Sequence, residues 1–272
     1  MKNHSEAVKE YWEDESCGER YASTDSDQYE FYQSETNTRY SLEPFILDFG
    51  KFYTCTDKTV LEIGVGMGSD HSRIAQSLPK RLVGIDLTKR SIEHTRKRFF
   101  LLDLNSELLV QDTEKLSFPD NTFDIVYSWG VLHHCFNTVK AVNEMLRVLK
   151  KGGEARLMIY HKYSVTGLML WLRYGLFSGQ LFKTLNQVYA EQLESPGTTA
   201  YSIREAKDLF RRFSTCRLHI QLSHGDLLLG QVGKKHQGKL LKLAKVLWPV
   251  RLLRVLNMLI PVGLFLMVEV RK

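Results

Sequence analysis

Short apolar runs alternate along the chain with longer stretches in which apolar residues recur at helical spacing. Strands are predicted where the runs are continuous, at 59–63, 82–86, 107–111, 124–128 and 154–160. Helices are predicted from Ser69, over 89–101 and over 138–149, with Gly152 and Gly153 as the stop before the next strand. Alternation of this kind predicts an α/β fold with a mostly parallel sheet and helices on both faces.

The two ends of the chain depart from this alternation. The N-terminal part is polar but rich in aromatic residues, with a helix expected around 41–52, and it is interpreted as a cap. The C-terminal part predicts helices over 161–212, strands at 215–222 and 263–270, and a basic amphipathic helix over 239–259 that is interrupted at Pro249. We therefore expect a single domain over 1–272, made of a cap (1–55), a core (56–160) and a C-terminal half with helical insertions (161–272).

Composition narrows the protein class only modestly. With 43% hydrophobic and 25% charged residues, the chain is typical of soluble globular proteins. Its four cysteines are scattered, without a CxxC pair, and the N-terminus has no signal-peptide pattern. The sequence therefore predicts no disulfide framework, no metal site and no export, and a cytoplasmic location.

The net charge of +6 is concentrated in one segment. Residues 1–50 hold twelve acidic and four basic side chains, whereas seven basic residues lie within 234–254 and residues 227–268 contain no acid. A local patch of this kind does not indicate a nucleic-acid partner. A membrane-spanning segment over 246–268 is not expected, because Arg251 and Arg254 lie inside it and a proline and a glycine break the helix.

Two interpretations of the basic helix stay open. Its apolar side chains suit a helix packed on the sheet, which is the favoured reading, but they also suit peripheral docking of 234–254 on an anionic membrane. These apolar residues are Leu240, Leu243, Leu247, Leu252, Val255 and Leu259.

The stretch VLEIGVGMGSD at 60–70 places glycines directly after the first predicted strand. Gly64, Gly66 and Gly68 allow positive φ angles and let a ligand approach bare backbone amides. The spacing is GxGxG rather than the GxGxxG of dinucleotide enzymes, and no Lys-Ser/Thr pair follows as in a phosphate-binding loop. Since the turn also lacks Lys and Arg, the predicted ligand is a nucleoside without phosphates.

Acidic residues occur at the ends of three successive strands. Glu62 precedes the glycines. Asp86 ends the second strand, where a carboxylate can accept hydrogen bonds from both hydroxyls of a ribose. Asp112 follows the third strand and can accept an adenine amino group, whereas Asp120 and Asp124 are interpreted as turn and strand-start residues. Together these acids predict one nucleoside site more specifically than any of them alone.

With these residues the sequence resembles the class I S-adenosylmethionine-dependent methyltransferases, in particular the small-molecule group that includes quinone-biosynthesis methyltransferases. The resemblance is carried by VLEIGVGMGSD, VGIDLT, QDTEKLSFPDNTFDIVYSWGVLHH and EMLRVLKKGGEARLMI, and it covers about residues 55–160 strongly. It implies a doubly wound sheet of seven strands in the order 3-2-1-4-5-7-6, with the last strand antiparallel. Met67 departs from the family, which often has a small or polar residue there.

The resemblance also implies S-adenosyl-L-methionine as the cofactor and assigns its parts to positions in this chain. The methionine part and the ribose would contact the glycine turn, the adenine would contact the acidic segment after the third strand, and two residues of the fourth strand would line the pocket floor. The residues so assigned are Glu62, Gly64, Gly66, Gly68, Asp86, Leu87, Asp112, Thr113, Glu114, Ser128 and Trp129.

His133 and His134 follow the fourth strand, where the resembling enzymes expose side chains toward donor and acceptor. Either histidine could take the acceptor's proton, since its pKa lies near neutrality, but either could equally serve packing. Tyr160 and His161 occupy a comparable place after the fifth strand, and no sequence feature selects among them. Positioning the acceptor in line with the sulfonium methyl group supplies much of the rate acceleration, so a general base is required only if the acceptor atom is protonated.

The predicted function is methyl transfer to an oxygen, nitrogen or carbon of a small-molecule acceptor by in-line displacement. Since SWGV stands where nucleic-acid and protein N-methyltransferases have (N/D)PP(Y/F), those acceptors are not expected. A nicotinamide oxidoreductase would need the GxGxxG turn and a Tyr-x-x-x-Lys motif at the hydride-transfer site, and neither is found in position. A cofactor-binding protein without catalysis and a methyltransferase for a membrane-associated, lipid-like acceptor remain as alternatives. The N-terminal aromatic residues either form the acceptor pocket or anchor the cap.

Overall fold

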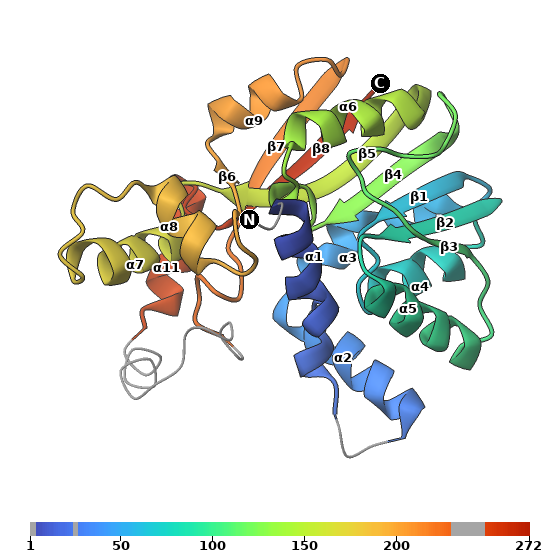
Figure 1. The fold of residues 1–272 in the computed structure, drawn as a ribbon, viewed down its shortest axis with the longest axis horizontal. Helices are drawn as coiled ribbons and strands as arrows, with labels where there is room; N and C mark the ends of the chain where they lie inside the picture. Colours follow the sequence, from blue (N-terminus) through green and yellow to red (C-terminus); the bar gives the residue numbers. More distant parts are fainter. Residues whose placement is uncertain (1–3, 24–26, 230–247) are drawn as a thin grey trace.

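One mixed sheet of eight strands organises the chain, in the order β3-β2-β1-β4-β5-β8-β7, with β6 paired to β5 off this path (Figure 1). The computed structural model describes residues 4–23, 27–229 and 248–272. The strands are β1 Thr59–Ile63, β2 Arg81–Asp86, β3 Glu107–Val110, β4 Phe123–Trp129, β5 Leu149–His161, β6 Ala200–Tyr201, β7 Thr215–Gln221 and β8 Phe265–Arg271. Strands β1 to β5 pair in parallel, whereas β8 is antiparallel to both β5 and β7. Apart from the two-residue β6, the predicted order and the antiparallel last strand are confirmed.

Helices cover both faces of this sheet, and further helices extend from the N-terminus and beyond β5 (Figure 1). The N-terminal and core helices are α1 His4–Asp14, η1 Glu19–Tyr21, α2 Gln28–Leu42, α3 Phe45–Gly50, η2 Phe52–Cys55, α4 Ser69–Gln76, α5 Lys89–Leu101, η3 Leu132–His134 and α6 Thr138–Val148. Those of the C-terminal half are α7 Val165–Trp171, the π-helical turn η4 Leu172–Leu176, α8 Leu185–Gln192, α9 Ile203–Leu209 and α11 Val250–Leu259.

The apolar core lies on both faces of the central strands. In β1, four consecutive residues are buried, and alternate side chains enter two different clusters because successive residues of a strand point to opposite faces. Leu61 packs in the cluster that α6 and α9 cover, whereas Val60 packs with residues of α4 and α5. Burial on both faces explains why the strand reads as a nearly continuous apolar run.

The glycine pair after α6 corrects one expectation. Helix α6 already ends at Val148, and Gly152 and Gly153 lie inside β5 rather than at the helix terminus. Leu149 pairs with Phe123, and a register shift then carries β5 along the rest of β4. Leu149, the last residue predicted to be helical, is therefore the first residue of β5, and the two glycines lie in the irregular part of that strand.

The packing expected for the basic helix is wrong in its described part. Leu252, Val255 and Leu259 are 64%, 54% and 78% exposed, whereas Leu253 is the residue that α11 buries. Leu253 packs in a small cluster beyond β7, so α11 does not lie on the sheet. The rest of the predicted helix, residues 239–247 with Leu240, Leu243 and Leu247, lies outside the described residues. Within the described ranges, no helix has the length and hydrophobicity to cross a membrane.

Candidate active site

A cavity opens at the carboxyl ends of β1, β2 and β4, beneath helix α1. Because parallel strands end at the same edge of the sheet, the loops that follow them meet there. The sequence-predicted residues that line this cavity are Gly64, Gly66, Asp86, Leu87, Asp112, Thr113, Glu114, Trp129 and His134. The structure thus brings together residues from four separate loops.

The three glycines of the turn all have positive φ angles, but they serve different contacts. A Cβ on Gly64 would lie 2.1 Å from Val131 Cγ2, and one on Gly68 would lie 2.9 Å from Thr95 Oγ1. At Gly66 the nearest atom would be 3.7 Å away. Gly64 and Gly68 therefore allow the turn to pack closely, whereas Gly66 presents open backbone to the cavity.

Asp86 is held at the cavity wall by donors of its own chain. Its Oδ2 accepts a hydrogen bond from the Gly66 amide at 3.1 Å, and its Oδ1 accepts hydrogen bonds from the amide and the hydroxyl of Thr88 at 3.0 and 2.8 Å. Burial raises the pKa of this carboxyl, although these hydrogen bonds oppose the rise. The carboxylate is thus fixed between the glycine turn and the start of α5.

The segment after β3 forms another part of the wall. Asp112 Oδ1 accepts the Glu114 amide at 2.8 Å, and Glu114 Oε1 accepts the Asn137 amide at 2.8 Å, just before α6. Thr113 is buried between these two acids. Trp129, at the end of β4, also lines the cavity and packs against Phe265 with ring centroids 5.7 Å apart.

Three residues assigned to the cofactor, Glu62, Gly68 and Ser128, do not line the cavity. Glu62 is buried behind the turn, with Oε2 2.8 Å from His71 Nδ1, and Ser128 donates to the Ile63 carbonyl at 3.1 Å. Burial, with Asp70 nearby, raises the pKa of Glu62 well above its usual value, and burial lowers the pKa of His71 to about 3. These groups support the turn from behind.

The charge of the lining distinguishes among nucleotide ligands. Asp86, Asp112 and Glu114 contribute carboxyl groups, and among the described residues no lysine or arginine lines the cavity. Such a lining favours a cationic or neutral ligand and disfavours a pyrophosphate, which binding sites normally neutralise with basic groups or exposed helix termini.

Helix α1 supplies lining residues that were not assigned from the sequence. Ser5, Val8 and Trp12 face the cavity from this helix, and Cys17 follows them. Only Trp12 had a signal, as one of the N-terminal aromatic residues. Other unassigned lining residues are Thr88, Ser91, Gly130, Val131, Cys135 and Phe136.

The other N-terminal aromatics that make described contacts mostly anchor the cap. Tyr40 donates to Asp70 Oδ1 at 2.9 Å, and the guanidinium of Arg98 lies 4.9 Å from the centre of the Tyr32 ring. Arg39 makes two hydrogen bonds to the same buried Asp70, at 3.1 and 2.7 Å. The contacts with Asp70 tie α2 to the first turn of α4, and the contact with Arg98 ties it to α5.

The two histidines of η3 are both buried but differ in position. His134 lines the cavity, whereas His133 stacks on the Tyr160 ring with centroids 3.8 Å apart. Burial, and secondarily His134, lowers the pKa of His133 well below its usual value. His161, also considered from the sequence, lies 3.1 Å from the Gly263 carbonyl through its Nδ1.

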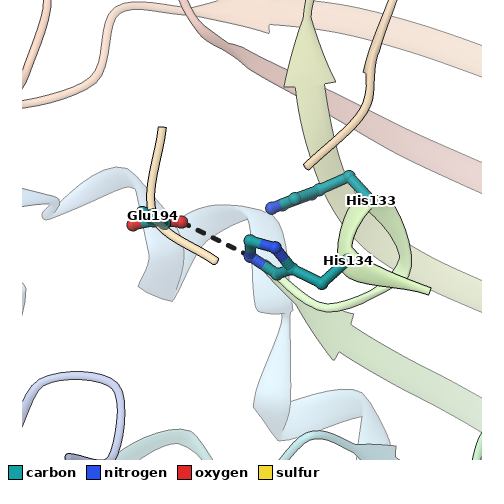
Figure 2. Close-up of side chains that lie close together, drawn as sticks. All are labelled: His133, His134 and Glu194. Atoms are coloured by element: carbon teal, nitrogen blue, oxygen red, sulfur yellow. Dashed lines mark ion pairs between the residues drawn. The ribbon is translucent and has the colours of Figure 1, made fainter. Parts of the chain in front are cut away.

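Glu194, which no sequence signal identified, lies beside these histidines (Figure 2). Its Oε2 is 3.3 Å from His134 Nε2 and accepts the Tyr160 hydroxyl at 2.7 Å. Burial alone would raise the pKa of Glu194, but the interactions with His134 and Tyr160 lower it.

Comparisons with known proteins agree with the motifs. Residues 60–153 match the methyltransferase domain family. Phosphoethanolamine N-methyltransferase 1 of Arabidopsis thaliana is 26% identical over 56% of this chain and 30% of its own length. Ubiquinone/menaquinone biosynthesis C-methyltransferase UbiE of Hydrogenovibrio crunogenus is 30% identical over 55% of this chain and 59% of its own length.

A solved structure of an S-adenosylmethionine dependent methyltransferase from Mesorhizobium loti shares the fold, with a TM-score of 0.54 and 14% identity over 84% of this chain and 97% of that chain. The core of this chain is therefore a methyltransferase domain of the S-adenosylmethionine-dependent class, whose cofactor is S-adenosyl-L-methionine, as the motifs predicted. The chain spans less than two thirds of the length of both curated relatives.

Proposed function

We propose that this protein transfers a methyl group from S-adenosyl-L-methionine to an oxygen, nitrogen or carbon atom of a small-molecule acceptor. The observation that carries the proposal is the cavity itself, where the open backbone of Gly66 meets the carboxyl groups of Asp86 and Asp112, and where no Lys or Arg of the described ranges lines the wall. This lining suits a nucleoside that carries a sulfonium cation.

In this proposal the cavity residues hold and orient the reactants. The cofactor supplies a methyl group on a positively charged sulfur, which is a good leaving group. Asp86 accepts the ribose hydroxyls, Gly64, Gly66 and Leu87 contact the nucleoside and methionine, and the adenine lies along Asp112, Thr113 and Glu114. Trp129 closes the floor. Glu62, Gly68 and Ser128 keep the turn and the strand ends in position.

We assign the acceptor contact to His134 and Trp12, whose rings pack edge to face with centroids 5.3 Å apart. His133, which does not line the cavity, supports His134 from behind. Holding acceptor and methyl about 3 Å apart in line supplies much of the acceleration. The names of the relatives differ, one being a phosphoethanolamine N-methyltransferase and the other a C-methyltransferase of ubiquinone/menaquinone biosynthesis, so the acceptor class has to be found by screening.

Calorimetric titration with S-adenosylmethionine and, separately, NADH tests the cofactor assignment. We expect micromolar binding of the first and none of the second. Asp86→Ala should weaken binding of S-adenosylmethionine at least tenfold, about 1.4 kcal/mol, because it removes the carboxylate that accepts hydrogen bonds from the ribose hydroxyls. Glu107→Ala is the matched control, since Glu107 is an exposed acid outside the cavity. Equal affinity in wild type and Asp86→Ala would refute the site. Binding without transfer to any acceptor would favour the non-catalytic alternative.

An observation on α11 favours a membrane-associated, lipid-like acceptor as a second candidate. Met258 and Leu259 are 83% and 78% exposed, and Arg251 and Arg254 are exposed on the same helix. Val165, at the start of α7, packs in the same small cluster as Leu253 of α11. Further exposed apolar residues follow on α7 and beyond it, namely Leu168, Leu176, Phe177, Leu181 and Phe182. Apolar and basic groups together suit an anionic lipid surface.

We also infer that 1–55, 56–160 and 161–272 act as one domain. Strands β7 and β8 come from the last of these parts and complete the sheet of the second. A truncated chain that ends at residue 160 would lack these two strands and should therefore fail to fold stably.

The four cysteines are all free thiols, which favours a reducing compartment such as the cytoplasm.

A further inference from the structure

Three potential metal ligands lie together beside the cavity, from segments about 60 residues apart in the sequence. His133 and His134 belong to η3, and Glu194 follows α8 (Figure 2). One side-chain donor atom from each lies within 4.8 Å of the others. The Thr199 amide donates to the His133 carbonyl at 2.9 Å and so ties the two segments to each other.

His133 is buried in a way that its present contacts do not explain. Its side chain is fully inaccessible, and neither ring nitrogen has a hydrogen-bond partner among the described residues. Leaving a buried polar atom without a partner costs about 1–3 kcal/mol, so such atoms are uncommon and need a reason. Figure 2 shows a ring nitrogen of His133 directed toward the space between His134 and Glu194.

His134 is oriented as a metal-binding histidine usually is. Its Nδ1 lies 2.8 Å from the Ser195 hydroxyl and 3.1 Å from the Thr198 hydroxyl, which fixes the ring and leaves Nε2 toward Glu194. A second hydrogen-bonding group of this kind commonly sets the tautomer and direction of a ligating imidazole. Within the part of the chain that the structure describes, the 3.3 Å approach to Glu194 Oε2 is the one polar contact of Nε2.

Glu194 is likewise held in place. The Tyr160 hydroxyl donates to its Oε2, and its backbone has a φ of 52°, in the left-handed region that non-glycine residues seldom occupy. Such a conformation costs about 1–3 kcal/mol in a non-glycine residue, and here it directly follows the C-cap of α8. The carboxylate is thus aimed at the histidines by both its backbone and its neighbour.

We propose that His133, His134 and Glu194 bind one divalent transition-metal cation of the zinc or iron(II) type. Two imidazoles and one carboxylate are the ligands that these cations prefer, and such sets leave positions open for further ligands. Because His134 also lines the cavity, the cation lies in the cavity wall, where an acceptor oxygen can complete its coordination. Ligand distances of about 2.0–2.2 Å require the three groups to draw closer, and Glu194, 35% exposed, has room to move.

The proposal goes beyond methyl transfer, since cation binding does not depend on the nucleoside. The purified chain, freed of metal with a chelator, is titrated with Co²⁺ and Zn²⁺ in calorimetry, and Co²⁺ is followed by its visible absorption. We expect one equivalent with micromolar or tighter affinity, and much weaker binding of Mg²⁺, which prefers oxygen ligands. Glu194→Gln should weaken Co²⁺ binding at least tenfold, and His133→Ala should do the same.

His219→Ala is the control, because His219 is an exposed histidine on β7 outside the cluster. It should leave the metal affinity within twofold of wild type. Circular dichroism of each variant shows whether it is folded. If His133→Ala does not fold, Glu194→Gln still tests the metal site, because its amide oxygen can accept the hydrogen bond from the Tyr160 hydroxyl. S-adenosylmethionine binding should persist in Glu194→Gln, which separates a failure of the metal site from a failure of the cofactor site. Absence of Co²⁺ and Zn²⁺ binding in the folded chain, or unchanged affinity in Glu194→Gln, overturns the proposal.

Discussion

Glu62 is a motif residue whose side chain lies behind the glycine turn rather than in the cavity. It is only 2% exposed, and its partner His71 also lies 3.0 Å from the Ser106 hydroxyl through Nε2. Successive side chains of a strand point to opposite faces, so an acid inside β1 faces the layer of helix α4 instead of the strand end. Burial favours the uncharged form of this carboxyl and of the imidazole beside it.

A neutral amide should therefore replace Glu62 at little cost. We expect Glu62→Gln to stay within about 1 kcal/mol of wild type in free energy of unfolding, because the amide can still hydrogen-bond His71. Glu62→Ala should lose about 1–3 kcal/mol, since it leaves Nδ1 of the buried His71 without its hydrogen-bond partner. Urea unfolding at pH 7 measures both variants. Equal losses in Gln and Ala would show that the carboxylate charge is required, which is incompatible with an uncharged Glu62.

The sequence predicted the cavity residues that stand at strand ends and missed those that depend on long-range packing. Gly66, Asp86 and Asp112 meet because the carboxyl ends of parallel strands share one edge, which follows from the alternation itself. Trp12 and Glu194 reach the same region only through the placement of α1 and of the segment after α8. No local pattern encodes that placement, so the sequence could offer Trp12 only as one of several N-terminal aromatic residues and could not assign Glu194.

Helix α2 is held to the core by a buried ion pair. Arg98 of α5 and Glu35 of α2 have side chains only 2% exposed, and their atoms lie 2.5 Å apart. Arg98 also donates to the Met67 carbonyl, inside the glycine turn, at 2.7 Å. The pair therefore connects the cap, the helix after β2 and the turn at the cavity.

Removing one partner of this pair should be costly. Glu35→Ala leaves the buried Arg98 guanidinium uncompensated, and we expect a loss of about 3–5 kcal/mol in the free energy of unfolding. Arg81→Ala is the control, because it breaks an ion pair whose side chains are 41% and 51% exposed and should cost about 0–1 kcal/mol. Chemical denaturation measures both. Similar losses in the two variants would mean that the cap is not held by this pair.

Element boundaries were predictable where periodicity and capping residues agree. The helix expected over 89–101 matches α5, and Thr88 caps it by accepting the Ser91 amide. The pattern failed at Gly152 and Gly153, because a glycine pair after a helix and a glycine pair inside an irregular strand look alike in sequence. Pairing with β4, a non-local interaction, decides between them.

For the whole molecule, the exposed apolar residues of α11 and the α7 region predict peripheral binding to anionic membranes. Sedimentation with vesicles of phosphatidylglycerol should retain the full chain at low salt, and phosphatidylcholine vesicles should not. Exchanging Arg251 and Arg254 for glutamate should reduce retention several-fold, since each basic residue near the surface contributes about 1 kcal/mol. The matched control, Arg211→Glu with Arg212→Glu, changes exposed charges after α9. Equal retention by both lipids would contradict an electrostatic docking surface.

We propose that the cavity under α1 binds the adenosyl cofactor, and a crystal structure of the chain with S-adenosylhomocysteine tests this assignment. We expect the nucleoside in this cavity, with its ribose hydroxyls on Asp86, its backbone contact at Gly66 and its adenine beside Thr113. A nucleoside bound elsewhere on the chain, or a cavity that stays without it at saturating concentration, would refute the assignment.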